Sequence, residues 1–124
     1  MLGEAAVIAF AATTSAERAR AFYGDALGLP LRSEDTFALV FDAHGTMLRV
    51  QKVAAVQPPP YTVLGWQVAD IAHAIQALSQ RGVEVERFPG LELDGLGVWT
   101  TPDGSRVAWF KDPEGHVLSL TQLA

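Results

Sequence analysis

The sequence contains no cysteine among its 124 residues. It therefore has no disulfide framework, no thiolate nucleophile and no cysteine-based zinc site. It also lacks an apolar run of about 18 residues, so no segment is predicted to span a membrane. The short apolar run at residues 5–12 has no lysine or arginine before it, which is typical of a buried strand rather than a signal peptide. The cytoplasm is therefore the expected location by default.

Positive charge is also scarce in this chain. Nine Lys and Arg residues against 14 Asp and Glu residues give a net charge of −5 and a pI near 5.0. Because nucleic-acid binding depends on a basic surface, this composition argues against nucleic acid as the main partner. The content of 49% hydrophobic and 19% charged residues is typical of a globular chain. At this length we expect one compact domain, or two small halves that share a core.

A turn followed by a strand occurs twice in the sequence. The first copy is residues 42–50 (DAHGTMLRV), and the second is residues 112–120 (DPEGHVLSL). Asp and Gly recur at the same places in both turns, where Asp bonds to the backbone and Gly accepts a positive φ. In the strands that follow, Arg49 corresponds to Ser119. Two copies of one pattern indicate an internal duplication.

The segments around this repeat predict the order strand, helix and three strands in both halves, and the second half has one additional predicted strand. The first half has predicted strands at 5–12, 29–33, 37–41 and 46–53 and a helix at 15–27 that ends at Gly28. The second half has predicted strands at 61–68, 83–88, 98–101 and 106–111, a last strand after the second turn, and a helix from Asp70 to Gly82. Three consecutive prolines at 58–60 cannot join a sheet interior, so residues 55–60 are predicted to link the halves.

The chain resembles the vicinal oxygen chelate superfamily, which includes glyoxalases, extradiol dioxygenases, fosfomycin-resistance enzymes and bleomycin-resistance proteins. The resemblance rests on the paired modules, on residues 21–23 (AFY) and 27–28 (LG) of the first helix, and on residues 111–116 (KDPEGH). It implies an α+β fold in which two tandem βαβββ modules, at about 4–54 and 61–124, form a curled, cup-shaped mixed sheet. The helices would cover the outer face of that sheet.

Metal-using members of this superfamily carry His, Gln or Glu on the first and last strands of each module. Carried over to this sequence, the four positions are Ile8, Arg49, Val63 and Ser119. Divalent cations prefer carboxylate oxygen or imidazole nitrogen, whereas Ile and Val have no donor atom and Arg brings a permanent positive charge. The resemblance therefore implies a member with no metal and no other cofactor.

We expect Arg49 to point into the cup and to bind an anionic or carbonyl group of a small ligand, because its neighbours Leu48 and Val50 face the helix. The alternative is that Arg49 pairs with Glu92 or Asp94, or lies in an interface. For Trp99 and Trp109, which are among the predicted site residues, packing in the core is an alternative to ligand binding. The other predicted ligand-binding residues are Gln51, Ser119, Thr121, Ile8, Phe10, Val63, Trp99 and Trp109.

The histidines His44, His73 and His116 have no mutual spacing that makes a metal cluster. We interpret them as solvated surface residues without a catalytic role. No Ser or Thr forms a recognisable constellation with His and Asp either, so no catalytic residue is predicted.

Three hypotheses for the function follow. The first is a metal-independent protein that binds a small, anionic or partly aromatic molecule, as a sequestering or resistance factor does. The second is a lyase, isomerase or dioxygenase of the same superfamily with a displaced or absent metal site. The third is a non-catalytic partner module whose cup is filled by side chains. The resemblance also implies a homodimer, in which modules pair within one chain or across two chains.

Overall fold

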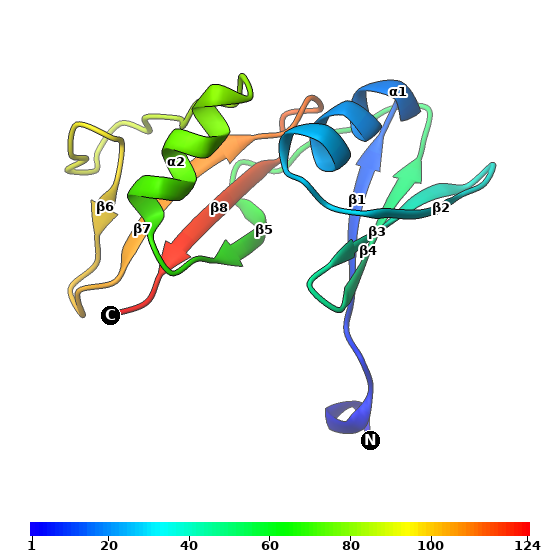
Figure 1. Cartoon of the computed structure of the whole chain (residues 1–124), viewed down its shortest axis with the longest axis horizontal. Coiled ribbons are helices and arrows are strands. Elements are labelled where there is room, and N and C mark those ends of the chain that lie inside the picture. Colours follow the sequence, from blue (N-terminus) through cyan, green and yellow to red (C-terminus); the bar gives the residue numbers. More distant parts are fainter. The chain divides into compact units, whose positions relative to one another are not determined.

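The computed structural model describes residues 1–124, which divide into two compact units, Met1–Gln57 (unit 1) and Pro58–Ala124 (unit 2). Each unit is a four-stranded mixed sheet with a helix on one face (Figure 1). In both units the order along the chain is strand, helix and three strands. The predicted α+β class and the two tandem βαβββ modules are confirmed. No helix has the length and apolar character needed to cross a lipid bilayer.

Unit 1 has the sheet order β1-β4-β3-β2, in which β1 is parallel to β4 and the other pairs are antiparallel. Its elements are η1 (Leu2–Glu4), β1 (Ile8–Thr13), α1 (Ala16–Ala19), η2 (Arg20–Ala26), β2 (Leu31–Glu34), β3 (Ala38–Ala43) and β4 (Thr46–Lys52).

Unit 2 repeats this arrangement with the sheet order β5-β8-β7-β6, and β5 is parallel to β8. Its elements are β5 (Thr62–Gln67), α2 (Ile71–Gln80), β6 (Trp99–Thr100), β7 (Arg106–Lys111) and β8 (Val117–Gln122).

Both helices begin close to the predicted residues, and each has a side-chain cap. Ser15 Oγ accepts a hydrogen bond from the Arg18 backbone N–H at 3.2 Å, and Asp70 Oδ1 accepts one from the His73 backbone N–H at 3.0 Å. These bonds satisfy donors that have no partner within the helix. Gly28, with a φ of 76°, follows the first helix, where a side chain would be strained.

The first helix differs from the prediction in its second part, because η2 is a π-helix. The backbone N–H of Leu27 bonds to the carbonyl of Phe22 at 2.9 Å, five residues back. The wider turn buries both Phe22 and Tyr23, whose rings meet edge to face with centroids 5.0 Å apart. Tyr23 also contacts Phe41 of the sheet at a centroid distance of 5.9 Å. π-helical turns are rare, and no residue spacing in the sequence predicts one.

The core of each unit lies between its helix and its sheet. In unit 1, Leu48 and Val50 of β4 are fully buried on the helix side, and in unit 2 Leu118 of β8 and Phe110 of β7 are buried in the same way. Burial of one such side chain contributes about 1.5–3 kcal/mol. Alternate residues of β4 and β8 therefore face away from the helices.

The predicted strand at residues 83–88 is wrong. This segment makes a single isolated bridge, from Glu86 to Trp109 of β7. The same edge of β7 is occupied further along by β6, which pairs Trp99 with Val107. Because two segments share one short edge, neither can extend along it. Without this strand, unit 2 has the same element order as unit 1.

Candidate functional site

Arg49 lies on the side of its sheet that the helix leaves uncovered. Arg49 is on β4, where it is paired with Phe10 of the neighbouring β1 and with Val40 of β3 on the other side. These three side chains therefore share one face of the sheet. Phe10 is 52% exposed, and Ile8 and Met47 on the same face are also exposed. We call this surface, with Ile8, Phe10, Val40, Met47, Arg49 and Gln51, the open face of unit 1. The register therefore places Ile8, Phe10, Arg49 and Gln51 together.

The guanidinium of Arg49 is half-buried and has no hydrogen bond or ion pair within unit 1. Other arginines of this unit are paired: Arg20 with Glu34 at 3.2 Å and Arg32 with Asp42 at 3.0 Å. Asp35 is held mainly by two backbone N–H groups, which lower its pKa, and the charge of Arg49 adds a smaller effect in the same direction. The guanidinium of Arg49 therefore remains without a bonded partner within unit 1.

Asp94, one of the two carboxylates that the sequence analysis gives as alternative partners for Arg49, forms hydrogen bonds and an ion pair within unit 2. Asp94 Oδ1 accepts hydrogen bonds from the backbone N–H groups of Leu96 and Val98, both at 2.9 Å. Its other oxygen lies 3.5 Å from Arg106. The Val98 N–H is the main cause of the lowered pKa of Asp94, and Arg106 contributes less.

The residues at the four positions that the resemblance assigns to metal ligands have side chains that are poor ligands for a divalent cation. Ile8 and Val63 offer no donor atom, Arg49 is a cation, and Ser119 supplies a single hydroxyl. No group of three or more His, Asp or Glu side chains converges anywhere in the chain. The donor set therefore does not fit a divalent cation.

The structure also shows that Val63, the third of these four positions, is not the residue of β5 that is paired with Ser119. The pairing of β5 with β8 is irregular between Thr62 and Leu64, which leaves Val63 as an extra, unpaired residue. After this bulge, Gly65 is the residue paired with Ser119. Val63 is partly exposed but does not lie beside Ser119.

Ser119 is buried even though it lies on the face away from α2. On β8 it alternates with Leu118 and Leu120, which are on the helix side, and its neighbour on β7 is Trp109. The indole Nε1–H of Trp109 donates a hydrogen bond to Thr62 Oγ1 at 3.1 Å, on the far side of β8. An indole that reaches from β7 to β5 must cross β8, which explains why Ser119 is only 8% exposed.

Aromatic rings surround this point on the sheet. Trp99 stacks on Trp109 with centroids 6.2 Å apart and an interplanar angle of 28°, and Phe88 meets Trp109 edge-on at 6.0 Å. Both tryptophans keep part of their surface exposed. Trp66, in contrast, stacks on Phe110 of the helix-side core at 6.2 Å. Trp99 and Trp109 therefore belong to the face of unit 2 away from α2, which we call the open face of unit 2.

Thr121 continues this face beside Val107 and Gln67, so the structure brings Ser119, Thr121, Trp99 and Trp109 onto one surface. A hollow of about 480 Å³ lies next to Trp99, between it and the loop at residues 92–94. Gly65, which the sequence analysis did not single out, is paired with Ser119 on β8. A glycine inside a strand often marks the close approach of another group, here the Ser119 hydroxyl.

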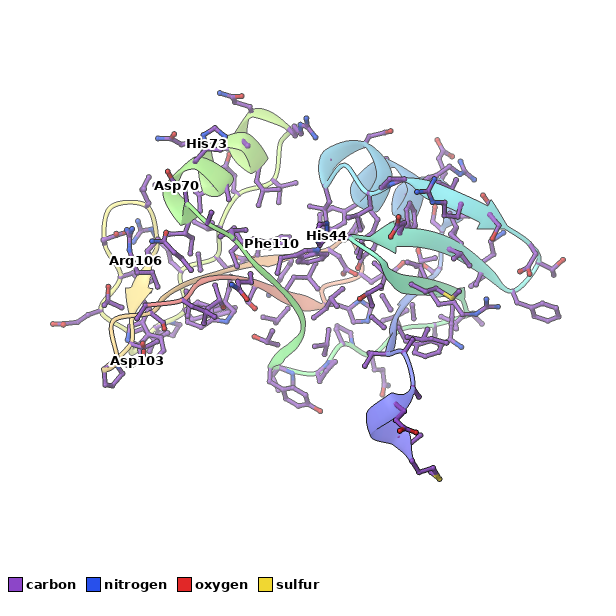
Figure 2. All side chains as sticks on the ribbon, turned by 60° about the horizontal axis from the view of Figure 1, so that its bottom comes forward. His44, Asp70, His73, Asp103, Arg106 and Phe110 are labelled. Carbon is purple, nitrogen blue, oxygen red and sulfur yellow. The ribbon has the colours of Figure 1, made fainter.

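The interpretation of the histidines as surface residues is wrong for His116. Its side chain is buried, with the residue 7% exposed, and its Nδ1 lies 2.7 Å from Oδ2 of the buried Asp112. The other carboxylate oxygen of Asp112 accepts the backbone N–H groups of Glu114 and His116. This His–Asp pair closes the turn before β8. His73 is exposed and points outward from α2 (Figure 2).

Comparisons with solved structures agree with the fold described above. FosX, a genomically encoded fosfomycin resistance protein from Listeria monocytogenes, superposes with a TM-score of 0.75 at 13% identity, covering 95% of this chain and 92% of that chain. A bleomycin-binding protein complexed with bleomycin superposes with a TM-score of 0.72 at 17% identity, covering 95% and 98%. A glyoxalase family protein from Enterococcus faecalis gives a TM-score of 0.70 at 22% identity, covering 94% of each chain.

At the level of sequence, no curated protein matches the chain significantly. The family model described as "Glyoxalase/Bleomycin resistance protein/Dioxygenase superfamily" matches residues 6–120, which is nearly the whole chain. The chain therefore belongs to the glyoxalase/bleomycin resistance protein/dioxygenase superfamily.

Proposed function

We propose that this chain is a metal-independent protein that binds a small molecule and holds an anionic group of it with Arg49. The observation that carries this proposal is the position of Arg49, half-buried on an apolar open face without a partner in its unit. An unpaired guanidinium in such a place favours an incoming carboxylate or phosphate, with which it forms two parallel hydrogen bonds.

Simple electrostatics favours an anion over a metal at this position. Two like unit charges about 4 Å apart repel by roughly 4 kcal/mol at an effective dielectric near 20, and a divalent ion would be repelled more. An anion at the same distance from Arg49 would be attracted by an energy of the same size. Each hydrogen bond to a charged group contributes about 1.5–3 kcal/mol to this preference.

The rest of the proposed contacts are apolar or neutral. On the open face of unit 1, Phe10 and Ile8 supply apolar surface and Gln51 a neutral amide. A mostly apolar surface with few polar groups is typical of small-molecule sites. The superposition on a protein crystallised with bleomycin supports a binding role for this fold. The proposed contacts on unit 2 are Val63, Ser119, Thr121, Trp99 and Trp109.

We also propose that the protein is a cytoplasmic homodimer. Strands β1 and β5 are edge strands, each with one side that its own sheet leaves unpaired. β1 is apolar and carries no charged residue that would discourage pairing with another strand. Pairing with a second chain would satisfy the unpaired backbone groups of this edge. Sedimentation of the purified protein tests this, and a monomer at every concentration would contradict it.

Binding of a flat organic anion tests the role of Arg49. We expect 2-naphthoate to bind the wild-type protein in isothermal titration calorimetry, and Arg49→Met to lower its affinity at least about tenfold, because a charge-assisted bond is lost. The matched control is Arg32→Met, which removes an arginine of the same unit that is paired with Asp42. This control should bind within about twofold of wild type. Equal affinity of Arg49→Met and wild type would refute the proposal.

A metal assay separates binding from metalloenzyme chemistry. We expect the purified protein to contain less than about 0.1 equivalent of Zn, Ni, Mn or Fe, and 2-naphthoate to bind equally with and without EDTA. Stoichiometric metal whose removal abolishes binding would favour a superfamily enzyme with a displaced metal site.

A further inference from the structure

A hollow of about 290 Å³ lies beside α2, on the helix side of unit 2 and apart from its open face. Residues of α2, of the segment that follows it and of the loop at residues 95–96 line this hollow, which we call the α2 hollow. Its apolar lining consists of Ile75, which is buried, and of Val85 and Leu96, which are half-buried. The volume is close to the lower end of the range of about 300–1,000 Å³ that is typical of ligand pockets, so it suits a molecule of amino-acid size.

Two side chains of opposite charge line the α2 hollow without being paired to each other. Glu84 Oε1 accepts a hydrogen bond from Ser79 Oγ at 2.8 Å, and the carboxylate forms no ion pair. The Nη2 group of Arg87 donates to the backbone carbonyls of Asp94 and Gly95, at 2.9 and 2.8 Å, and the guanidinium forms no ion pair either. The hollow therefore has one carboxylate and one guanidinium that both lack a partner of opposite charge.

The neutral hydrogen bonds hold both ionic groups in place and leave part of each group available. Arg87 uses only Nη2 for the two carbonyls, so the N–H groups of Nε and Nη1 remain as donors. Glu84 uses one oxygen for Ser79, and its Oε2 remains as an acceptor. Side chains fixed in this way lose less rotamer entropy when a ligand binds. Guanidinium donors favour a carboxylate, and a carboxylate oxygen favours an ammonium group.

We infer that the α2 hollow is a binding site for a small zwitterion with an apolar body, which is the chemistry of a free apolar α-amino acid. The ammonium group of the ligand binds Glu84, its carboxylate binds Arg87, and its side chain packs on the apolar lining. The two charges of the hollow cancel, so a ligand with a single charge is attracted by one of these groups and repelled by the other. This inference goes beyond the proposed function, because it involves neither Arg49 nor an open face.

The probe for this site is L-leucine, and its binding is followed through the backbone N–H signals of ¹⁵N-labelled protein. We expect saturable shifts of the signals of Gln76, Ser79 and Leu96, which line the hollow, and no shift of the indole signal of Trp109 on the open face. Two analogues of leucine each lack one charge: 4-methylpentanoate has no ammonium group and 3-methylbutylamine has no carboxylate. Each analogue should bind about threefold to tenfold more weakly than leucine, because one charged contact is lost.

Two variants assign the contacts of the two charged groups. We expect Glu84→Gln to weaken leucine binding about threefold to tenfold and not to weaken that of 4-methylpentanoate, which has no ammonium group. Arg87→Gln should weaken leucine binding by a similar factor and should not weaken that of 3-methylbutylamine, which has no carboxylate. The matched controls are Glu86→Gln and Arg81→Gln, which remove the same charges from residues outside the hollow. Both controls should bind leucine within about twofold of wild type.

The inference is overturned if either analogue binds the wild-type protein as tightly as leucine does, a comparison that needs no variant. It is also overturned if leucine shifts no signal around the hollow, or if Glu84→Gln and Glu86→Gln bind leucine alike while both remain folded by their NMR spectra. Its failure is distinguishable from that of the proposed function. Arg49→Met should bind leucine as wild type does, and Glu84→Gln should bind 2-naphthoate as wild type does.

Discussion

The two units share one chain order and one sheet order, yet their open faces differ at the corresponding residues. In unit 1 the central position of β4 is Arg49, an unpaired cation beside the exposed Phe10. In unit 2 the central position of β8 is Ser119, a neutral hydroxyl beneath Trp109. The two units share the order of their strands and an apolar core on the helix side, while their open faces carry different residues. This comparison indicates that the buried face specifies the fold, and that the two units differ in chemistry on their open faces.

The turns before these strands differ in the same manner. Asp42 is only partly buried, and it accepts the Gly45 backbone N–H at 2.7 Å and pairs with Arg32. Asp112 is buried and holds His116 at 2.7 Å in addition to two backbone N–H groups. One repeated aspartate therefore serves a surface turn in unit 1 and a buried polar cluster in unit 2.

Removal of the two aspartates should give the largest difference between the units. We expect Asp112→Ala to lower the free energy of unfolding by about 2–4 kcal/mol, because it leaves the buried His116 and two backbone N–H groups without their acceptor. Asp42→Ala should have a clearly smaller effect, since water can replace a partly exposed carboxylate. Urea unfolding followed by circular dichroism measures both values. Equal losses would contradict the distinction between the two turns.

The glycines of the two turns should give a smaller difference. Gly45 and Gly115 both have a φ near 90°, at 91° and 92°, so alanine at either position costs about 1–2 kcal/mol in backbone strain. An added Cβ meets nothing near Gly45 but lies 3.3 Å from Cγ of Pro58 near Gly115. We expect Gly115→Ala to be the more destabilising of the two in thermal unfolding. A reversed order would show that Pro58 moves aside freely.

The smallest expected effect concerns the pH dependence of the turn in unit 1. The pKa of Asp42 is lowered from 3.8 mainly by the Gly45 backbone N–H and then by the Arg32 hydrogen bond. A carboxyl with a lowered pKa in the folded state contributes stability above its unfolded pKa, and this contribution is lost as the pH falls through the folded value. We expect an NMR titration to place the Asp42 pKa below 3.8, and Arg32→Met to raise it slightly. No change in this variant would remove Arg32 as a cause.

Much of the fold could be predicted because the signals are local. The cap at Asp70, the helix stop at Gly28 and the two Asp-x-x-Gly turns each fix a boundary through the conformation of one or two residues. Alternation along β4 also predicts correctly that Arg49 faces away from Leu48 and Val50. These predictions need no knowledge of distant contacts.

The parts of the site that the sequence did not predict depend on contacts between distant segments. The bulge at Val63 appears only in the pairing of β5 with β8, and it moves Gly65 beside Ser119. The reach of Trp109 to Thr62 spans 47 positions of the chain. The burial of His116 follows from its pairing with Asp112 in a turn whose sequence is polar, so composition alone indicated an exposed residue.

The most direct test of the central claim is the ¹H–¹⁵N signal of the Arg49 Nε–H during titration with 2-naphthoate in the presence of EDTA. The account predicts a saturable shift of this signal, with the signals of Arg20 and Arg32 unchanged because both are already paired. A titration in which Arg49 does not respond, or in which EDTA abolishes binding, would contradict it.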